Sequence, residues 1–311
     1  MAKAATKKPF FQRLKLDLIR YKWLYLFFAL PIVLYYAIFK YIPLYGLQIA
    51  FKDYKITKTM WECAWVGFKH FQSFFSSMFF FRTLSNTLII NLLNLAFGFP
   101  APIIFALLLN EVENSKFKKV VQTVTYLPHF VSMVVICGLI TTFASKDGLF
   151  NTIIAFFGGK RTDLLMSKAA FRPLYIASGI WAGFGWGSII YLSALAGVDQ
   201  EQYEAAYIDG AKRFQRMLYI TLPGIMPTIA IKLIMEIGSL MSVGSEKILL
   251  LYSPLTYEVA DVISTYVYRK GMEDSDYSYS AAVGLFNSVI NVILLTFANA
   301  MSRRMTDTSL W

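Results

Sequence analysis

Two side chains of opposite charge stand four residues apart inside a long apolar stretch of the sequence. Lys232 and Glu236 would lie on one face of a helix, where side chains at this spacing are neighbours. A single charge at the centre of a membrane helix costs about 2.5 to 3.5 kcal/mol on insertion scales, and pairing offsets part of that cost. The pair therefore indicates either the lining or gate of a polar pathway, or a structural contact with another helix.

Amide side chains recur at helical spacing in two other apolar stretches. Asn91 and Asn94 lie in one of them, and Asn287 and Asn291 lie in the other. Amides at membrane depth usually face the interior of a helix bundle. They are candidate pathway residues, because amides offer hydrogen-bond donors and acceptors to a polar solute, but hydrogen bonds between helices explain them equally well. The candidate aromatic faces of such a pathway are Trp181, Trp186 and Tyr191.

Signals for catalysis or metal binding are weak. His129 has no metal ligand or carboxylate at a useful spacing, which favours a packing or capping role. Cys63 and Cys137 are too few for a disulfide scaffold or a zinc site, and Cys137 is expected to be a small apolar filler. Neither an H-E-x-x-H pattern nor a serine-triad signal is present. We therefore expect no catalytic residues and no metal site, and we do not expect an enzyme.

Small and rigid residues punctuate two of the apolar stretches. Gly183, Gly185 and Gly187 form a G-x-G-x-G run, but no predicted strand precedes it and the chain has no P-loop pattern. In a membrane helix such residues more often allow close helix packing. Pro100 and Pro102 follow a glycine inside another stretch, where the helix is expected to bend.

A polar break with an unusual pattern separates two apolar stretches, over residues 197–223. Asp199 is a candidate helix cap, with Gln202 as its capping-box partner, and the helix is predicted to run to about Ile208. Gly210 then permits a sharp turn, because residues with a Cβ adopt the required backbone conformation poorly.

A second helix is predicted from about Lys212 to Ile220, and Pro223 marks the entry to the next apolar stretch. The small side chains and the two carboxylates at this turn suit a knob that seats closely against a partner protein. An ordinary polar loop between two spans is the alternative. The candidate docking residues are Glu204, Ala205, Ala206, Asp209, Gly210 and Ala211.

The elements that must position these residues follow from hydrophobic length. The chain has 311 residues and is 57% hydrophobic and only 16% charged, whereas soluble domains are usually nearer 25% charged. A membrane-spanning helix needs about 20 apolar residues. We therefore predict an all-α membrane protein with about six transmembrane helices. The candidate spans cover residues 23–45, 84–109, 120–144, 173–196, 222–249 and 279–301.

Basic residues set the expected orientation. The net charge of +11 comes from lysines and arginines that flank the spans, so we expect no nucleic-acid partner. A dense basic cluster before residue 23 places both termini and the 197–223 loop in the cytoplasm. The predicted organisation is a cytoplasmic and interfacial segment at 1–22, a transmembrane domain at 23–301 and a cytoplasmic tail at 302–311. Within the first segment, residues 10–22 are expected to form an amphipathic helix on the inner leaflet.

An outer loop over residues 61–81 is dense in tryptophan and phenylalanine. It indicates either a docking surface for an external partner or an interfacial segment packed on neighbouring helices.

The 197–223 loop resembles the EAA motif of permease subunits of ATP-binding-cassette importers. Asp209 and Ala211 match the sugar-transporting branch of that family. Segments 38–54, 106–111, 126–130, 282–295 and the terminal TSLW resemble the maltose-permease-like branch for oligosaccharides and polysaccharide fragments, so the similarity covers nearly the whole chain. The residues at the general motif positions are Glu204, Ala205, Ala206, Gly210, Ile220, Leu222 and Pro223.

This resemblance implies a type I importer permease fold in a bacterial plasma membrane, with the loop as a coupling helix. A second permease subunit, of a different sequence, would complete the pathway, and an external binding protein would deliver an oligosaccharide. Two cytosolic ATPases would bind ATP and Mg²⁺, so this chain itself would hold no cofactor. Residues 204–211 would seat in a cleft of one ATPase, whose closure would switch the spans between two states.

Two alternatives remain open from the sequence. One is an importer permease for a solute other than a sugar. The other is a self-sufficient secondary transporter, which would need inverted repeats and ion-coupling carboxylates within its spans.

Overall fold

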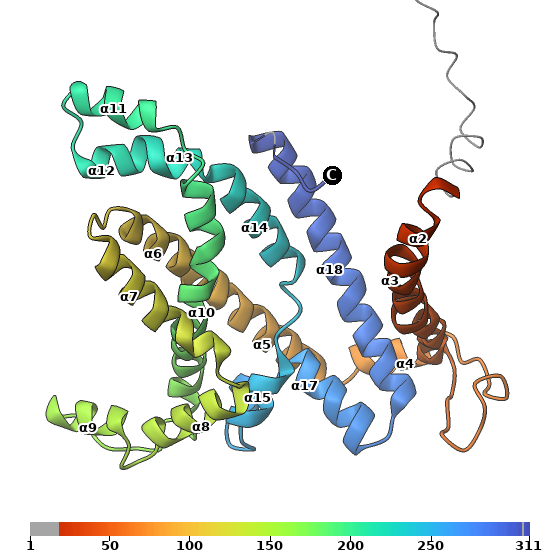
Figure 1. Ribbon diagram of the computed structural model, residues 1–311. Helices are drawn as coiled ribbons and strands as arrows, with labels where there is room; N and C mark the ends of the chain where they lie inside the picture. The colour runs from red at the N-terminus through yellow and green to blue at the C-terminus, as the bar shows by residue number, and fades with distance from the viewer. Residues whose placement is uncertain (1–18, 307) are drawn as a thin grey trace, which may run out of the picture.

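The computed structural model describes residues 19–306 and 308–311, and that part of the chain is helical (Figure 1). Its one β feature there is an isolated bridge between Lys52 and Trp65. The predicted all-α class is therefore confirmed. Residues 1–18, which hold most of the predicted amphipathic helix and of the N-terminal basic cluster, lie outside the described residues.

The helical elements alternate between long, apolar segments and short connecting helices. The first segment consists of α2 (Lys22–Leu24), η1 (Tyr25–Ala29), α3 (Leu30–Tyr36), η2 (Ala37–Tyr41) and η3 (Ile42–Phe51). The next elements are α4 (Lys69–Phe75), α5 (Phe79–Leu93), η4 (Asn94–Gly98), α6 (Pro100–Asn110), α7 (Ser115–Tyr126), η5 (Leu127–Phe130), α8 (Met133–Ala144) and α9 (Leu149–Phe156).

The second half of the chain begins with the long, uninterrupted helix α10. Its elements are α10 (Lys168–Leu195), α11 (Gln200–Ile208), α12 (Arg213–Arg216), η6 (Met217–Thr221), α13 (Leu222–Gly224), α14 (Met226–Gly238), α15 (Ser245–Leu251), α16 (Tyr257–Ala260), α17 (Ile263–Tyr268), η7 (Arg269–Glu273) and α18 (Tyr277–Thr306).

In the described residues, four helical segments are long and apolar enough to cross a membrane, and six if each of two bent pairs counts as one span. This agrees with the prediction of about six. The four are Lys22–Phe51, Phe79–Asn110, Met133–Phe156 and Tyr277–Arg304. The bent pairs are Lys168–Leu195 with Gln200–Ile208, and Arg213–Gly224 with Met226–Gly238.

The predicted span over residues 120–144 is wrong as a single helix, because η5 and two extended residues separate α7 from α8. Pro128 in η5 lacks a backbone donor, and Ser132 caps α8 by accepting a hydrogen bond from the amide of Val135 at 3.4 Å. The apolar segment of sufficient length is Met133–Phe156 instead.

The predicted span over residues 222–249 is also interrupted. Helix α14 ends at Gly238 and α15 begins at Ser245, and the residues between them form turns and irregular backbone. Serine and glycine favour non-helical backbone, and they cluster in this segment. The members of that cluster are Ser239, Ser242 and Gly244.

Four prolines inside the helical segments are preceded by the same backbone feature. A π-helical turn ends two residues before each of Pro31, Pro43, Pro100 and Pro223. In η4, the amide of Phe99 donates to the carbonyl oxygen five residues back, at 2.9 Å. The wider turn shifts the backbone carbonyls relative to the proline ring, which would otherwise clash with one of them. The span that contains Pro100 therefore continues to Asn110, and the bend expected there stays a prediction.

Two glycines of α10 allow neighbouring helices to approach closely. A Cβ at Gly185 would lie 2.2 Å from the carbonyl oxygen of Thr125 in α7, and one at Gly187 would lie 3.3 Å from the Cβ of Pro102 in α6. The packing role predicted for the glycine run is confirmed at these two positions. Gly183 has no neighbouring atom within 4 Å of such a Cβ and faces open space.

The two ends of the molecule differ in what they carry. Figure 1 shows α11 and α12 as a hairpin at one end, together with the C-terminal end of α18 and the start of α2. Helices α9, α15 and α17 lie at the opposite end. The first helical segment stands apart from the bundle, and its last part, η3, packs against α18.

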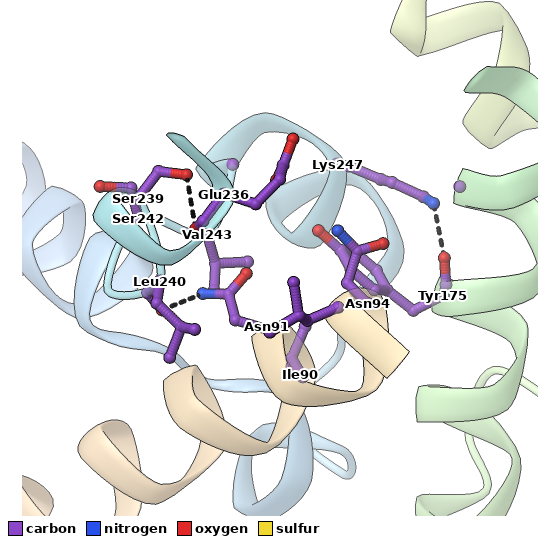
Figure 2. Close-up of a pocket in the computed structure, with 13 residues that line it drawn as sticks. Ile90, Asn91, Asn94, Tyr175, Glu236, Ser239, Leu240, Ser242, Val243 and Lys247 are labelled. Carbon is purple, nitrogen blue, oxygen red and sulfur yellow. Dashed lines mark hydrogen bonds between the residues drawn. The ribbon is translucent and has the colours of Figure 1, made fainter. Parts of the chain in front are cut away.

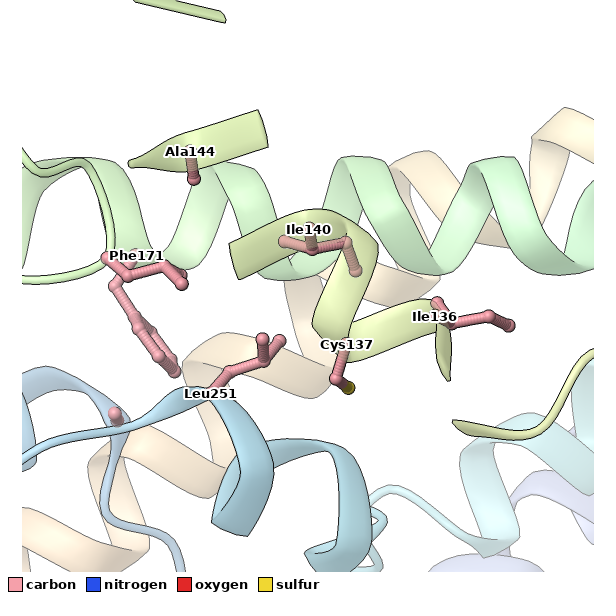
Figure 3. Close-up of a cluster of buried hydrophobic side chains, with 8 residues drawn as sticks. Ile136, Cys137, Ile140, Ala144, Phe171 and Leu251 are labelled. Atoms are coloured by element: carbon pink, nitrogen blue, oxygen red, sulfur yellow. The ribbon is translucent and has the colours of Figure 1, made fainter. Parts of the chain in front are cut away.

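A buried apolar cluster ties α8 to α10 and α15 near the end that carries α9. Cys137 belongs to it and is only 2% exposed, so its predicted role as apolar filler is confirmed. Both cysteines are free. Figure 3 labels Ile136, Cys137, Ile140 and Ala144 of α8, Phe171 of α10 and Leu251 of α15.

At the same end, a buried carboxylate holds two arginines. The side chain of Asp261 is fully buried and accepts from Arg82 at 3.0 Å and from Arg269 at 2.7 and 2.8 Å. Beside it, Asn86 donates to the carbonyl oxygen of Asp261 at 2.9 Å and accepts from Arg172 at 2.7 Å. This network joins α5, α10 and the segment from α16 to η7.

Some aromatic side chains of the segment 61–81 are buried in the bundle, and others are exposed. Phe74 of α4 is fully buried and packs against the rings of Tyr266 and Tyr279. Trp65 and Phe68 remain exposed. The packing interpretation is confirmed for Phe74, and a docking role of the exposed rings stays a prediction.

Candidate functional site

Two adjoining cavities lie between the α5–η4 junction, α10 and α14. Their volumes are about 210 and 200 Å³, and Asn94, Gly179 and Glu236 line both of them. Figure 2 shows the first cavity, with Asn91, Asn94, Glu236 and Lys247 arranged around it. These residues come from four separate helical elements, so the cavities exist only because the fold brings distant segments together.

The predicted ion pair lies in one wall of the second cavity. Lys232 Nζ and Glu236 Oε1 are 3.5 Å apart across one turn of α14. Both side chains are partly exposed, by 31% and 39%, and both line the cavity together with the buried Tyr191 of α10. Because the pair faces a cavity and is not sealed against another helix, its geometry favours the pathway interpretation over the structural one.

Amides from two other helices hold the irregular segment between α14 and α15. Asn91 donates to the carbonyl oxygen of Leu240 at 2.5 Å. Asn291 accepts from the amide of Met241 at 3.0 Å and donates to the hydroxyl of Ser242 at 2.7 Å. These bonds satisfy backbone groups that the break in the helix leaves without partners, as the interior of a membrane protein requires. Asn91 and Asn291 therefore position one wall of the first cavity.

Sequence reasoning missed a second lysine of the site. Lys247 of α15 is 8% exposed, and its Nζ donates to the carbonyl oxygen of Tyr175 in α10 at 2.7 Å. The same atom lies 4.4 Å from the centroid of the Tyr175 ring. Gly179 leaves room for this contact, since a Cβ there would be 3.2 Å from the Nζ. The available signal was a charged residue inside a predicted span, which by itself marks a functional candidate.

Four of the predicted pathway residues do not line these cavities, and one of them, Asn291, acts only through the segment that it holds. Trp181 lines a separate apolar hollow between α8, α9 and α10. The ring of Trp186 stacks on His129, with centroids 4.4 Å apart and planes at 5°, which confirms the packing role of the histidine. Asn287 is on α18, and its Oδ1 is buried without a hydrogen-bond partner in the described structure. Trp181 and Trp186 are on α10 but line neither cavity, whereas Asn287 is on α18, which contributes no residue to either lining.

The predicted hairpin of the polar break is present. Asp199 caps α11 by accepting a hydrogen bond from the amide of Glu201 at 3.0 Å. The expected capping-box contact from Gln202 is not among the hydrogen bonds of the described residues. At the second helix, Gln215 accepts from the amide of Lys212 at 2.7 Å and so caps α12.

Gly210 closes α11 with a Schellman motif. Its φ is +75°, its amide donates to the carbonyl oxygen of Tyr207 at 3.0 Å, and the amide of Ala211 donates to that of Ala206 at 2.9 Å. Glycine is favoured in this left-handed conformation. A Cβ at Gly210 would meet no atom within 4 Å, so the requirement for glycine is conformational and not steric.

The tip of the hairpin exposes apolar side chains next to charged ones. Tyr207, Ile208 and Phe214 are 71%, 84% and 67% exposed. A contiguous exposed apolar surface rimmed by polar residues is typical of an interface with another protein. Of the predicted docking residues, four are exposed and two are half-buried: Glu204, Ala205, Asp209 and Gly210, then Ala206 and Ala211.

The hairpin is fixed to the two helices that carry the cavity walls. Helix α11 continues α10 after a 77° bend, and α13 leads into α14 after a 60° bend. The hydroxyl of Tyr203 donates to Thr221 at 3.0 Å, and Arg213 forms an ion pair with Glu113 at the α6–α7 junction. A displacement of the hairpin would therefore act directly on α10 and α14.

An apolar cluster packs the base of the hairpin against the helix bundle. Tyr191, Leu195 and Ile225 form its buried centre with three residues of α6, and residues of the hairpin base pack against it. Tyr191 also lines the second cavity, so the base of the hairpin and the cavity share a wall. The packed residues of the hairpin base are Val198, Met217 and Leu222.

The site offers hydrogen-bond donors, acceptors and charges to a ligand. In the described residues, no group of three or more histidines, cysteines, aspartates or glutamates is placed to hold a metal ion. The polar groups of the two cavities instead match what a hydroxyl-rich solute requires, because each hydroxyl both donates and accepts.

Sequence comparison gives one family match and several full-length relatives. The family described as "Binding-protein-dependent transport system inner membrane component" matches residues 98–307. Protein LplB of Bacillus subtilis (strain 168) is 46% identical over 293 residues, covering 94% of this chain and 92% of that protein. The polygalacturonan/rhamnogalacturonan transport system permease protein YteP of the same organism is 44% identical, covering 98% of this chain and 95% of that protein.

Solved structures with the same fold include a bacterial ABC transporter involved in the import of the acidic polysaccharide alginate. A chain of it is 45% identical, with a TM-score of 0.87, and the match covers 94% of this chain and 99% of that one. A second structure shows the bacterial alginate ABC transporter in complex with alginate pentasaccharide-bound periplasmic protein. Its matching chain is 43% identical, also with a TM-score of 0.87, and covers 97% of this chain and 99% of that one.

Proposed function

Because the chain belongs to the family of binding-protein-dependent transport system inner membrane components, we propose that it forms half of the translocation pathway for an oligosaccharide in an ATP-driven importer. The observation that carries this proposal is the exposed hairpin joined directly to α10 and α14, the helices that line both polar cavities. In a chain built this way, a movement of the hairpin at one end changes the shape of the two cavities in the middle. The names of YteP and of the alginate importer support a saccharide as the solute.

The motion would come from two cytosolic ATPases. In this proposal, residues 204–211 seat in a cleft of one ATPase, with Gly210 and the small alanines permitting close approach. ATP and Mg²⁺ bind to the ATPases, and this chain needs no cofactor. A sister permease supplies the other half of the pathway, and an external binding protein delivers the solute.

The solute would pass the groups that face the two cavities. Asn94 and the Lys232–Glu236 pair offer donors and acceptors, and Tyr191 offers an aromatic edge. Asn91 adds a polar group to the first cavity and also holds its wall. Trp181, Trp186 and Asn287 are outside this set, and Asn291 acts through the segment that it positions.

The direct test is uptake by the complete importer in proteoliposomes. With the sister permease, both ATPases and the binding protein present, oligosaccharide is expected to accumulate only when hydrolysable ATP is supplied to the ATPase side. A non-hydrolysable ATP analogue is the control. Accumulation driven by an ion gradient without the ATPases would identify a secondary transporter and refute the proposal.

Orientation in the bacterial plasma membrane gives a separate prediction. We propose that the hairpin and both termini face the cytoplasm, so a cysteine introduced as Ile208→Cys should react with a membrane-impermeant thiol reagent in inside-out vesicles only. Ile56→Cys lies between the first two predicted spans and should react in right-side-out vesicles only, and both side chains are exposed enough to be labelled. The parent cysteines are buried and give a low background. Labelling of Ile208→Cys from outside would overturn the docking role.

A further inference from the structure

The charges that face the two cavities do not cancel. Three charged side chains line them: Lys232, Glu236 and Lys247. The first two pair with each other at 3.5 Å. Lys247 has no carboxylate oxygen within 4 Å of its Nζ in the described part of the chain. The lining therefore carries an excess of one positive charge.

A buried ammonium without an anion is costly, and its two protein contacts compensate only in part. The carbonyl oxygen of Tyr175 takes one of the three donors of Lys247, at 2.7 Å, and the Tyr175 ring faces the charge at 4.4 Å. No other hydrogen bond of this ammonium occurs among the described residues. Two donors are therefore left at a group that lines the cavity.

Lys247 is held by its contacts with Tyr175 of α10. Its ammonium reaches the carbonyl oxygen of α10 beside Gly179, and the neighbouring wall, the segment after α14, is held by Asn91 and Asn291. A cation held this firmly is pre-organised to bind an anion, because little side-chain freedom is lost on binding. The amide of Asn94 and the serine side chains of the 239–244 segment, all in the same lining, offer partners for hydroxyl groups.

We infer that Lys247 binds the carboxylate of a uronic acid residue, so that the oligosaccharide carried by this permease is acidic. The inference rests on the proposed function and narrows its substrate class. A single excess positive charge matches a carboxylate of one negative charge, and charge-assisted hydrogen bonds to it are stronger than those to a neutral hydroxyl. The surrounding amides and serines hold the hydroxyl groups of the same sugar.

The test compares acidic oligosaccharides with uncharged copies of themselves. Oligogalacturonate and oligomannuronate are offered to the complete importer in proteoliposomes, alongside the same chains with their carboxyl groups reduced to primary alcohols, and alongside a malto-oligosaccharide. Each is supplied at a concentration that saturates the binding protein. The variant is Lys247→Met, which keeps the length of the side chain and removes its charge.

For the wild type, ATP-dependent uptake of one acidic oligosaccharide is expected to exceed that of its reduced copy by about tenfold or more, the usual worth of a charged hydrogen bond. Lys247→Met should lower uptake of the acidic chain by about the same factor and leave the reduced chain within about twofold. The control Lys168→Met removes an exposed lysine that is paired with Glu258 and lines neither cavity, and it should change the uptake of neither chain.

The possible failures are distinct. An equal loss of acidic and reduced chains in Lys247→Met, with intact complex on gel filtration, would show that Lys247 only supports the fold. A wild type that prefers the reduced or malto-oligosaccharide would overturn the inference while leaving the proposed function standing. Absence of ATP-dependent uptake of every saccharide would count against the proposed function itself.

Discussion

Replacing Gly210 by valine is expected to lower ATP-driven uptake by at least about tenfold while the permease remains folded and inserted. The backbone at this position has a φ of +75°, where a β-branched residue is a genuine outlier and costs about 1–2 kcal/mol or more. That strain is relieved by rearranging the turn, which breaks the bonds from Gly210 to Tyr207 and from Ala211 to Ala206. The measurements are uptake in proteoliposomes and the amount of ATPase that co-purifies with the permease.

The matched control at this position is Gly210→Asn. Asparagine tolerates the left-handed region far better than valine, and no atom lies close enough to obstruct either side chain. Coupling in Gly210→Asn should therefore stay close to that of the wild type. If both variants bind the ATPase and transport normally, the geometry of the turn is irrelevant to coupling and the hairpin is only a connection between spans.

The hairpin could be predicted from sequence because its determinants are local. A cap at Asp199, a glycine at position 210 and the proline at 223 each act within a few residues, and the motif that joins them is contiguous. The Lys232–Glu236 pair was predictable for the same reason, since its two members are one helical turn apart. Local rules also gave the number of spans, because length and composition decide it.

The cavities could not be predicted this way, because their walls are assembled from residues far apart in the chain. Asn91 meets Leu240, and Lys247 meets Tyr175, across separations that no helical period encodes. The break after α14 could not be predicted from the sequence, because apolar residues on both sides of it make residues 222–249 look like a single span. Trp181 shows the converse error, because its helix is correct but its face is turned toward α8 and α9.

The broken helix α14–α15 links the two parts of the site. The hairpin enters α14 through α13, α14 carries Lys232 and Glu236, and the segment after it reaches Lys247 through only a few residues. A helix that continued unbroken would pass motion straight to the opposite end of the molecule. The break is held from the side by amides of α5 and α18, and in the proposed mechanism α14 would move against this wall. Such an arrangement changes the shape of a cavity when one end is displaced.

In the proposed mechanism the opposite end of the bundle stays rigid, and the buried ion pairs of Asp261 contribute to that rigidity. Asp261→Ala is expected to destabilise the folded permease by about 3 kcal/mol or more, because it leaves Arg82 and Arg269 next to an empty, buried site. The loss removes the ion pairs through which Arg82 of α5 and Arg269 of η7 share one carboxylate. Thermal unfolding of the purified importer, followed by fluorescence-detected gel filtration, measures the effect as a lower melting temperature.

The control for this prediction is the exposed ion pair at the same end. Glu258→Gln removes the partner of Lys168, but both side chains are solvent-exposed and such pairs contribute little to stability. Its backbone carbonyl still accepts from Asn86, so the rest of the network is unchanged. An unaltered melting temperature in Asp261→Ala would mean that the hydrogen bonds of Asn86 and Arg172 and the apolar packing hold that end without the Asp261 ion pairs. Rigidity at this end would then not depend on Asp261, and the uptake of both variants should be equal.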